Sequence, residues 1–355
     1  MGVRRPSAGV RAAVLALDAG NSKTDAALVG ADGRVLGTGR AGGFQPQLTG
    51  TGAAVDVLEQ AVTQAARAAG LPGPAAAAGA SGAAGAAGAA PAGLPYADTV
   101  SACLAGADFP VEEQQLADAI AARGWGAATQ VRNDTFAILR AGLPAGRPPR
   151  GVAVVCGAGI NCAGMLPDGR TARFPSVGRI SGDWGGGGGL AREALWSAAR
   201  AEDGRGGPTG LAAALPGHFG LGSMAALIEA LHLGHLAWRR VHELVPVLFE
   251  VAAAGDRVAA ALVERQAKEV VAMASVALAR LDLLAQEAPV LLGGGVLTAG
   301  HPQLDGPIRA GLAERAPLAR VSVVAAPPVL GAALLGLDAV GAPPAAHAEL
   351  RAHFG

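Results

Sequence analysis

Residues whose types suit phosphate binding follow the first apolar segment of the chain, residues 14–17. The carboxylate of Asp18 comes directly after this segment. The turn that follows consists of small, polar and basic residues, namely Gly20, Asn21, Ser22 and Lys23. Small residues let backbone N–H groups approach phosphate oxygens, a hydroxyl adds a donor, and a carboxylate suits a hydrated Mg²⁺ held between itself and the phosphates. The alternative is a β-hairpin whose Asp and Asn only shape the turn, and this segment alone leaves both interpretations open.

The same pattern of strand, glycine turn and strand returns at residues 151–166. Its turn contains Gly157, Ala158, Gly159 and Asn161. Each of the two hairpins opens one half of the chain, which indicates a duplicated domain. Further along, Asp183 and Trp184 precede five consecutive glycines, residues 185–189. Such a run loses much entropy on folding, so some feature must require it, and close approach of the backbone to a ligand is one such feature.

A second carboxylate of interest is Asp134, which lies between a predicted strand, residues 128–132, and a helical segment that contains Phe136. One interpretation is a helix N-cap, a frequent use of aspartate. The other is a general base that accepts a proton from a hydroxyl as the hydroxyl attacks a phosphate.

Apolar periodicity predicts the elements that must position these residues. In the first half it predicts strands at 14–17, 24–29, 33–39, 99–104 and 128–132, and helices at 51–69, 111–123 and from Phe136 onward. In the second half it predicts hairpin strands at 151–156 and 162–166, helices from residue 190 and through most of 222–285, strands at 289–292 and 321–324, and helices at 304–314 and 329–340. Alternating strands and helices after a three-stranded opening imply mixed sheets with parallel crossovers.

We expect two domains from the length of 355 residues. The Pro- and Arg-rich residues 147–150 break the chain, so the first domain spans residues 1–145 and the second 146–328, and we expect the final helix, 329–355, to pack back on the first. Residues 71–94 repeat Ala, Gly and Pro without a clear period, which predicts a surface insertion.

Composition excludes several classes of partner. Lys plus Arg and Asp plus Glu both number 28, so no basic field attracts nucleic acid. Three cysteines offer no disulfide framework and favour a reducing compartment. Neither a membrane-like apolar run nor a leader with a cleavage site is apparent. We therefore expect a soluble, cytoplasmic protein without nucleic-acid or membrane partners.

The order of these segments resembles that of the sugar kinase, heat-shock 70 and actin ATPase superfamily. More closely, the chain resembles the BadF/BadG/BcrA/BcrD ATPase family and its N-acetylglucosamine kinase-like branch. The matching segments are two phosphate loops, residues 18–24 and 157–161, an adenosine motif at 293–296, segments 104–108 and 133–135, a sugar-binding motif at 181–183 with the glycines after it, and a closing helix at 331–334. The resemblance implies an α/β fold of two ribonuclease H-like (actin-like ATPase) domains with mixed sheets and an interdomain cleft.

The resemblance also implies the roles of the site residues. Asp134 would be the catalytic base, and Asp18 would hold Mg²⁺. The ATP-binding residues would be Asp18, Gly20, Asn21, Ser22, Lys23, Gly157, Ala158, Gly159, Asn161, Gly294 and Gly295. The sugar-binding residues would be Gln45, Asp108, Asn133, Asp134, Gly182, Asp183 and Trp184.

Several positions depart from the family pattern. Ala158 and Ile160 replace two hydroxyl residues of the second phosphate loop, so backbone N–H groups and Asn161 would have to do more. Trp184 replaces an acid, and it either stacks on the sugar or belongs to the core, the commoner place for an aromatic ring. The family's sugar-contacting Trp and Asn fall near Val177 and near Phe44 or Gln45.

The implied function is ATP-dependent phosphorylation of an amino sugar, N-acetylglucosamine or glucosamine, by a chain that could form a homodimer. One rival is an ATPase that activates an acyl-CoA dehydratase through an iron–sulfur cluster between subunits. Its cysteines should lie in an interface, whereas Cys103, Cys156 and Cys162 lie in predicted strands. Another rival is a non-catalytic sugar or nucleotide sensor, which the missing hydroxyls keep open. His232 and His235 are spaced for a metal pair, but no carboxylate or cysteine completes the set.

Overall fold

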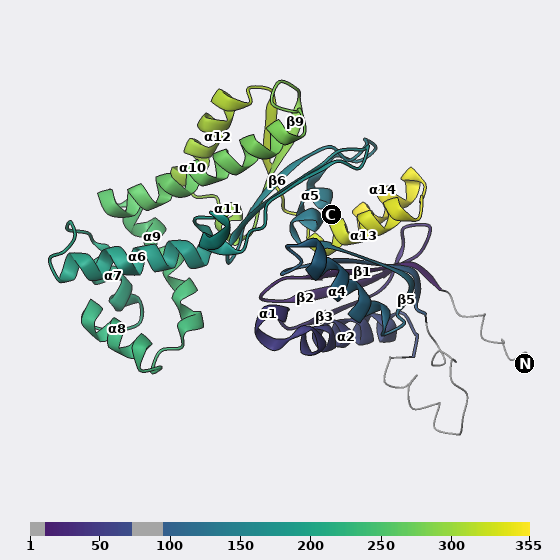
Figure 1. The fold of residues 1–355 in the computed structure, drawn as a ribbon, viewed down its shortest axis with the longest axis horizontal. Helices are drawn as coiled ribbons and strands as arrows, with labels where there is room; N and C mark the ends of the chain where they lie inside the picture. Colours follow the sequence, from purple (N-terminus) through teal and green to yellow (C-terminus); the bar gives the residue numbers. More distant parts are fainter. Residues whose placement is uncertain (1–10, 73–94) are drawn as a thin grey trace, which may run out of the picture. The chain divides into compact units, whose positions relative to one another are not determined.

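A computed structural model describes residues 11–72 and 95–355 as two compact units, each built around a five-stranded mixed sheet (Figure 1). The first unit runs to Pro149 and includes Ala325–Gly355, and the second is Arg150–Val324. The strand orders are β3-β2-β1-β4-β5 and β8-β7-β6-β9-β10, so both units share one connectivity. The first ten residues, and nearly all of the predicted insertion at 71–94, lie outside the described residues.

The first sheet is organised around β1, a strand whose eight residues are all buried. Its strands are β1 Ala12–Ala19, β2 Thr24–Val29, β3 Val35–Ala41, β4 Ala97–Leu104 and β5 Gly126–Asn133. β1 pairs antiparallel with β2 and parallel with β4, which pairs parallel with β5. A continuous apolar run is what a central strand covered on both faces requires.

Helices cover both faces of this sheet. They are α1 Pro46–Thr49, α2 Thr51–Ala68, α4 Pro110–Ala121, α5 Thr135–Gly142, α13 Pro328–Ala339 and α14 Pro344–Phe354. Leu15 and Leu17 of β1 share a core with Leu58 of α2 and Ile120 of α4. On the opposite face α13 packs so closely on β1 that a Cβ at Gly336 would lie 2.3 Å from Val14.

Ion pairs and hydrogen bonds attach the end of the chain to the first unit. Arg140 of α5 is buried and donates to both carboxylate oxygens of Asp338 on α13, at 2.7 and 3.0 Å. His347 of α14 lies 2.8 Å from the same carboxylate, and Arg351 donates to the carbonyl oxygens of Ala141 and Leu143 at the end of α5. The last helices therefore belong to the first unit although they follow the second in the chain.

The second unit repeats the sheet and adds a helical part. Its strands are β6 Gly151–Cys156, β7 Ile160–Met165, β8 Thr171–Arg173, β9 Ala288–Gly293 and β10 Ala319–Val323. Its helices are η1 Gly178–Ser181, α6 Gly186–Glu202, α7 Leu211–His218, α8 Met224–His232, η2 Trp238–Glu243, α9 Leu244–Ala253, α10 Arg257–Arg280, α11 Gly295–Thr298 and α12 Pro302–Arg315. The long helix α10 packs against the sheet, and α12 lies beside it (Figure 1).

Both predicted hairpins are confirmed, because β1 pairs with β2 and β6 with β7 in antiparallel register. The sequence places the domain boundaries at residues 145 and 328, whereas the structure divides the chain after Pro149 and Val324. In the described parts of the chain, several short or terminal elements had no counterpart in the sequence analysis, among them α1, β8, η1, α7, α11 and α14 as a helix separate from α13.

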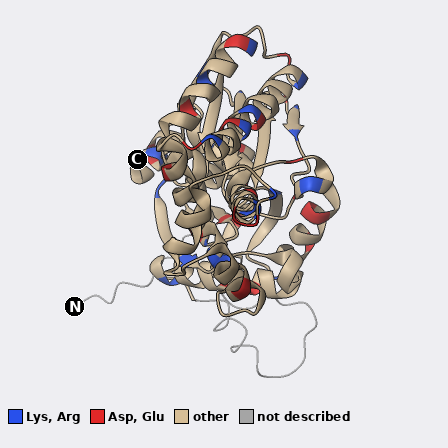
Figure 2. Cartoon of the chain, turned by 90° about the vertical axis from the view of Figure 1, so that its left-hand side faces the viewer, with Lys and Arg blue, Asp and Glu red and all other residues tan. Residues whose placement is uncertain are grey.

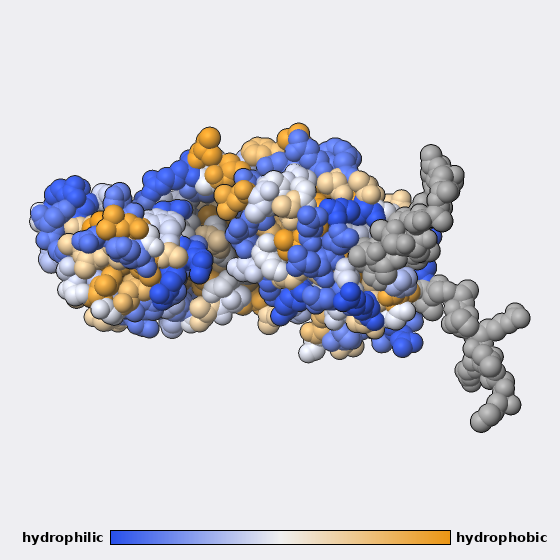
Figure 3. All heavy atoms as spheres, turned by 90° about the horizontal axis from the view of Figure 1, so that it is seen from below, coloured by the Kyte–Doolittle hydropathy of each residue, from blue (hydrophilic) through white to orange (hydrophobic). Residues whose placement is uncertain are grey.

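The surface carries mixed charges and scattered apolar side chains. Basic and acidic residues are interspersed on the face in Figure 2. At the left-hand end of Figure 3, which carries α7 and α8, apolar spheres lie among hydrophilic ones. The large exposed side chains there include Trp196 of α6, Ile228 of α8 and Trp238 of η2. Within residues 11–72 and 95–355, every helix is too short or too polar to cross a membrane.

The crossing of α5 and α13 yields a stability prediction. A Cβ built at Gly331 would lie 1.8 Å from the carbonyl oxygen of Ala137, so Gly331→Ala must push the two helices apart. We expect it to lower the free energy of unfolding by about 1–3 kcal/mol, the usual effect of overpacking. The matched control is Gly52→Ala in α2, where a Cβ meets no atom within 4 Å. Denaturant unfolding should leave the control unchanged or slightly stabilised, and equal effects for both variants would contradict the close crossing.

Candidate functional site

The first part of the site lies where three parallel strands end. Asp18 is near the end of β1, Leu104 ends β4, and Asn133 ends β5. The parallel registers pair Asp18 with Cys103 and Leu104 with Asn133, so these ends lie at one edge of the sheet. Polar residues at the carboxyl ends of parallel strands are a common place for ligand binding in α/β folds.

Asp18 is a buried carboxylate, only 6% exposed, that makes no hydrogen bond or ion pair with a described residue. It lies directly opposite Asp25 of β2, and directly opposite residues point to the same face of a sheet. Asp25 is compensated, because Arg40 contacts it at 2.6 Å and Lys23 at 3.2 Å. Asp18 therefore has no counter-ion among the described residues.

Burial raises the pKa of Asp18 well above its ordinary value, and the charges of Asp134 and Asp25 raise it further, while Lys23 opposes the shift. A cation would relieve this repulsion, and a carboxylate oxygen is the type of ligand that Mg²⁺ prefers. The described residues contain no group of three or more His, Cys, Asp or Glu side chains placed to share a metal. The arrangement fits an ion held by one carboxylate with water and phosphate completing its shell, the habitual coordination of Mg²⁺ beside nucleotides.

Asp134 follows β5 and begins α5, yet its side chain accepts no helix-capping hydrogen bond. Asn133 instead accepts from the N–H of Thr135 at 3.0 Å. Withdrawal from water raises the pKa of the half-buried Asp134 to about 6, opposed by the backbone N–H groups of Thr135 and of Asp134 itself. The capping interpretation is therefore not supported by the geometry, and a carboxylate with a pKa near neutrality suits a general base.

The neighbouring polar residues hold one another in place. The amide of the buried Asn133 donates to Asp108 at 2.8 Å, and Glu112 accepts from the backbone N–H of Asp108 at 3.0 Å. Gln45 donates to the carbonyl oxygen of Asn21 at 3.3 Å, which ties the segment after β3 to the first loop. The structure thus brings these predicted residues of the first unit to one edge of its sheet.

The first loop is open to solvent. Asn21, Ser22 and Lys23 are exposed, and the N–H of Gly20 donates to the carbonyl oxygen of Lys23 at 2.9 Å. Lys23 turns back to Asp25, so its charge already has a partner within the unit.

The second loop packs against the N-terminus of α6. The N–H groups of Gly187 and Gly188 donate to the carbonyl oxygens of Gly157 and Ala158, both at 2.8 Å. A Cβ at Gly186 would lie 2.3 Å from the backbone of Gly159. Here the glycine run is required by contact with the protein's own loop, whereas the sequence analysis attributed the requirement to a ligand.

Gln266 of α10 is a site residue that the sequence analysis missed. It is completely buried, and its amide oxygen accepts from the N–H of Gly186 at 2.8 Å. A Cβ at Gly185 would lie 2.1 Å from that oxygen. Nothing in the local sequence distinguishes Gln266 from the other polar residues of its helix, because the contact joins positions that are far apart in the chain.

Other predicted residues of the second unit have structural partners. The amide oxygen of Asn161 accepts from the N–H of Cys162 at 2.6 Å and from the hydroxyl of Ser176 at 2.5 Å. Gly294 adopts a φ of +83°, and a Cβ there would lie 2.4 Å from the carbonyl oxygen of Cys156. Gly295 begins the short helix α11 directly after it.

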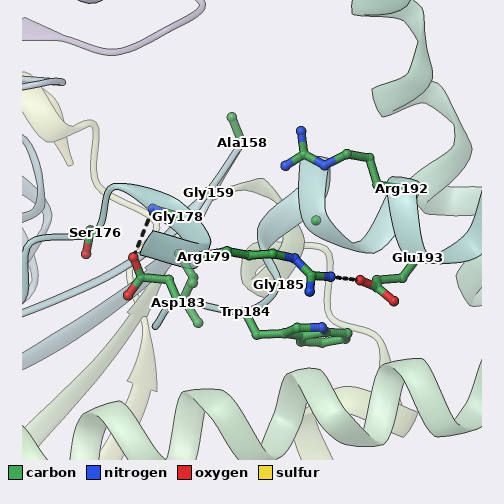
Figure 4. Close-up of a pocket in the computed structure, with 12 residues that line it drawn as sticks. Ala158, Gly159, Ser176, Gly178, Arg179, Asp183, Trp184, Gly185, Arg192 and Glu193 are labelled. Carbon is green, nitrogen blue, oxygen red and sulfur yellow. Dashed lines mark hydrogen bonds and ion pairs between the residues drawn. The ribbon is translucent and has the colours of Figure 1, made fainter. Parts of the chain in front are cut away.

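A pocket of about 170 Å³ lies between the second loop, η1 and the start of α6 (Figure 4). Asp183 lines it and accepts from the N–H of Gly178 at 3.1 Å and from the hydroxyl of Ser181, both at Oδ2. These bonds shape η1, as a turn-forming role requires, but Oδ1 has no hydrogen-bond partner among the described residues. Gly182, exposed with a φ of +85°, completes the turn.

Trp184 also lines the pocket, but its ring belongs to the core of the second unit. The side chain is only 6% exposed, and the Arg265 guanidinium lies 4.2 Å from the ring centroid. Its indole N–H has no hydrogen-bond partner among the described residues. A buried donor without an acceptor is uncommon, so this edge of the pocket has unmet hydrogen-bonding capacity.

The cysteines and histidines have ordinary environments. Cys103, Cys156 and Cys162 are buried and free, and burial raises the pKa of each thiol. His232 ends α8, and neither His232 nor His235 belongs to a metal-binding group in the described parts of the chain.

Comparison with known proteins identifies the family. The sequence pattern of the BadF/BadG/BcrA/BcrD ATPase family matches residues 15–336. The chain belongs to this family. The resemblance inferred from the sequence is thereby confirmed. The matched range contains the turns of both hairpins and most of α13.

One curated relative is the N-acetylmuramic acid/N-acetylglucosamine kinase of Clostridium acetobutylicum, which is 26% identical over 193 residues. The match covers 54% of this chain and 62% of that protein, so it spans less than two thirds of the relative's length.

Two solved structures show the fold. A Chromobacterium violaceum protein named as an N-acetylglucosamine kinase superposes with a TM-score of 0.67 at 22% identity, covering 92% of this chain and 99% of the other. A ROK family glucokinase from Streptomyces griseus, solved with glucose and AMPPNP, gives 0.54 at 19% identity over 92% and 99% of the two chains. The predicted fold class, two actin-like ATPase units with mixed sheets, is confirmed, and the interdomain cleft stays a prediction.

Gln266 provides a test of how the second loop is held. Gln266→Leu keeps most of the side-chain volume but leaves the N–H of Gly186 buried without an acceptor. We expect a loss of about 1–3 kcal/mol in the free energy of unfolding, the usual penalty for such a group. The control is Gln286→Leu on the exposed surface of the same unit, where a change within about 0.5 kcal/mol is expected. Equal stability of the two variants in denaturant titrations would refute the role of Gln266.

Proposed function

We propose that this protein transfers the terminal phosphate of ATP to a hydroxyl of an amino sugar, N-acetylglucosamine or glucosamine. The observation that carries the proposal is the pair Asp18 and Asp134, which share one sheet edge although neither caps a helix or forms an ion pair with a described residue. Membership of an ATPase family supports ATP as donor, and the relative from Clostridium acetobutylicum supports an amino sugar as acceptor.

In this proposal Asp134 is the general base. A sugar hydroxyl is a poor nucleophile, and a carboxylate at hydrogen-bond distance both orients it and takes its proton. The hydroxyl oxygen then forms a bond to the γ-phosphorus, the bond from phosphorus to the bridging oxygen breaks, and ADP leaves with that electron pair. The pKa of about 6 leaves Asp134 mostly ionised at neutral pH, as a base must be.

Asp18 would hold Mg²⁺ in the same proposal. The ion would neutralise charge on the phosphates, and its approach is favoured by the uncompensated carboxylate of Asp18. Asp25 stays with Arg40 and Lys23, so it is not needed as a ligand.

The remaining predicted residues divide between the two substrates. The phosphates would contact the first loop, residues 20–23, and the second loop, residues 157–159, with adenosine near Gly294 and Gly295. The sugar would contact Gln45, Asp108, Asn133, Gly182 and Asp183. Trp184 would contribute its indole N–H rather than a stacked ring, because the ring is buried.

The two alternative functions require different features of the protein. An activator of an acyl-CoA dehydratase would need cysteines accessible at an interface, and all three cysteines are buried. A non-catalytic sensor would bind sugar or nucleotide without forming a phosphosugar. Screening amino sugars for ATP consumption, with analysis of the product, separates the kinase from both rivals. A cytoplasmic location and a homodimer stay predictions from the sequence.

Asp134→Asn tests the base. The substitution keeps the shape of the side chain but removes its ability to accept a proton, so turnover should fall by about 10²–10⁴-fold. ATP affinity should stay within about twofold, and stability should not fall, because the raised pKa shows that the folded protein disfavours the charged form. Near-native turnover with an authentic phosphosugar product would remove Asp134 from the catalytic role.

The same variant has a pH signature. A base with a pKa of about 6 loses activity as protons bind, so kcat/KM of the unmodified protein should decline below about pH 6. Asp134→Asn should lack this limb in its residual activity. If the limb persisted in the variant, another group would be responsible for it.

Asp183→Asn tests sugar recognition separately from the turn. The asparagine carbonyl can still accept from the N–H of Gly178, while the charged acceptor for sugar hydroxyls is lost. Sugar affinity should fall by about 1.5–3 kcal/mol, the value of a hydrogen bond to a charged group, whereas ATP affinity should change little. Calorimetric titrations measure both, and parallel losses for sugar and ATP would favour a purely structural role for Asp183.

A further inference from the structure

Arg192 is a cation at the pocket of the second unit whose charge has no partner. It extends from α6 toward the pocket, is exposed, and makes no hydrogen bond or ion pair with a described residue (Figure 4). The next residue, Glu193, is paired instead with Arg179. Of the three charged side chains on this side of the pocket, two therefore neutralise each other and Arg192 does not.

Arg192 lies beside the second loop. A Cβ built at Gly188 would be 3.8 Å from Nη2 of Arg192 and 3.2 Å from the carbonyl oxygen of Ala158, so both groups flank the same glycine. Ala158 and Gly159 line the same pocket, and their backbone N–H groups have no acceptor among the described residues.

Trp184, which lines the same pocket, carries another donor without an acceptor among the described residues. The indole N–H of Trp184 is buried without an acceptor, and Figure 4 shows its nitrogen on the ring edge that faces Arg179 and Glu193. The guanidinium of Arg192 and the two free backbone N–H groups thus belong to residues that line one pocket of about 170 Å³. Several donors without acceptors in one pocket favour a ligand rich in acceptor oxygens, such as a phosphate group.

The loop itself lacks the side-chain hydroxyls that would otherwise bind such a group. Ala158 and Ile160 carry no hydroxyl. The N–H groups of Gly187 and Gly188 at the start of α6 are already bonded to the loop's carbonyl oxygens, so they are not available to an anion. A guanidinium can replace the missing hydroxyls, because its planar fork matches two phosphate oxygens.

We propose that Arg192 binds the terminal phosphate of ATP in this pocket and supplies the contact that the second loop lacks. This inference rests on the proposed function, since it takes ATP as the ligand of that loop. The terminal phosphate, rather than the inner ones, is assigned because the pocket also contains Asp183, the proposed sugar contact, and the transferred group must lie between the loop and the sugar.

The test compares nucleotides that differ by one phosphate. Affinities of AMPPNP and ADP are measured by calorimetry for the full chain and for Arg192→Gln and Arg192→Lys. We expect Arg192→Gln to lower the affinity for AMPPNP by about 10–100-fold and the affinity for ADP by less than about twofold, because a charged hydrogen-bonding contact is lost from one phosphate only. The AMPPNP affinity of Arg192→Lys should lie between those of the unmodified protein and Arg192→Gln, because lysine keeps the charge but lacks the planar guanidinium fork.

The matched control is Arg200→Gln on the same helix, where the guanidinium stacks on Trp196 and donates to the carbonyl oxygen of Arg205. It should leave both nucleotide affinities unchanged. Thermal unfolding should show that Arg192→Gln folds normally, as expected for an exposed side chain.

Three outcomes would overturn the inference. They are unchanged AMPPNP affinity in Arg192→Gln, equal weakening of AMPPNP and ADP, and a loss confined to acidic amino sugars, which would make Arg192 a sugar-carboxylate contact. If the unmodified protein binds AMPPNP but forms no phosphosugar, the proposed function fails while the assignment of Arg192 is still decided by the same titrations. If the unmodified protein binds neither nucleotide, both fail.

Discussion

A buried carboxylate at the end of a central apolar strand is the constraint around which the first unit is arranged. β1 is buried along its whole length because helices cover both faces of the sheet, and this burial extends to Asp18. An isolated charge in such surroundings is unfavourable, and here Asp25 and Asp134 add repulsion. The fold relieves Asp25 through Arg40 and Lys23 but leaves Asp18 without a counter-ion. A carboxylate with a strongly perturbed pKa at the end of a strand is the kind of group that functional sites contain, and the proposed function assigns it a cation and the phosphates that the cation accompanies.

The second unit has the same sheet connectivity, but different contacts shape its loop. Its loop carries no carboxylate, and its shape depends on backbone contacts that leave no room for side chains. Gly186 approaches Gly159, Gly294 approaches Cys156, and Gln266 holds the N–H of Gly186 from a helix behind them. The duplicated hairpin therefore supports a carboxylate in one unit and a cradle of N–H groups in the other. In the proposed function, this division would provide a metal site in one unit and donors for phosphate oxygens in the other.

In several residues one atom or neighbour makes the structural contact, which leaves another polar atom available to a ligand. Oδ2 of Asp183 shapes the turn at η1, whereas Oδ1 has no partner among the described residues. Asn133 takes the capping bond at α5 and supports Asp108, which frees the adjacent Asp134 from that task. In Trp184 the ring fills the core while the N–H has no acceptor among the described residues.

What the sequence determined by itself was local pattern: the two hairpins, the strand that ends in Asp18, the helix after Asp134 and the order of motifs that marks the family. These follow from periodicity and turn chemistry within about 15 residues, the range over which sequence patterns act. Three features depended on tertiary structure, namely the reason for the glycine run, the release of Asp134 from capping and the burial of the Trp184 ring. The first and the last depend on neighbours that are distant in the chain, Gln266 behind Gly186 and Arg265 over Trp184, whereas the second depends on how Asn133 and Asp134 are oriented where β5 meets α5. Only folding brings such residues together, because burial and hydrogen-bond pairing are properties of the packed chain and not of any segment alone.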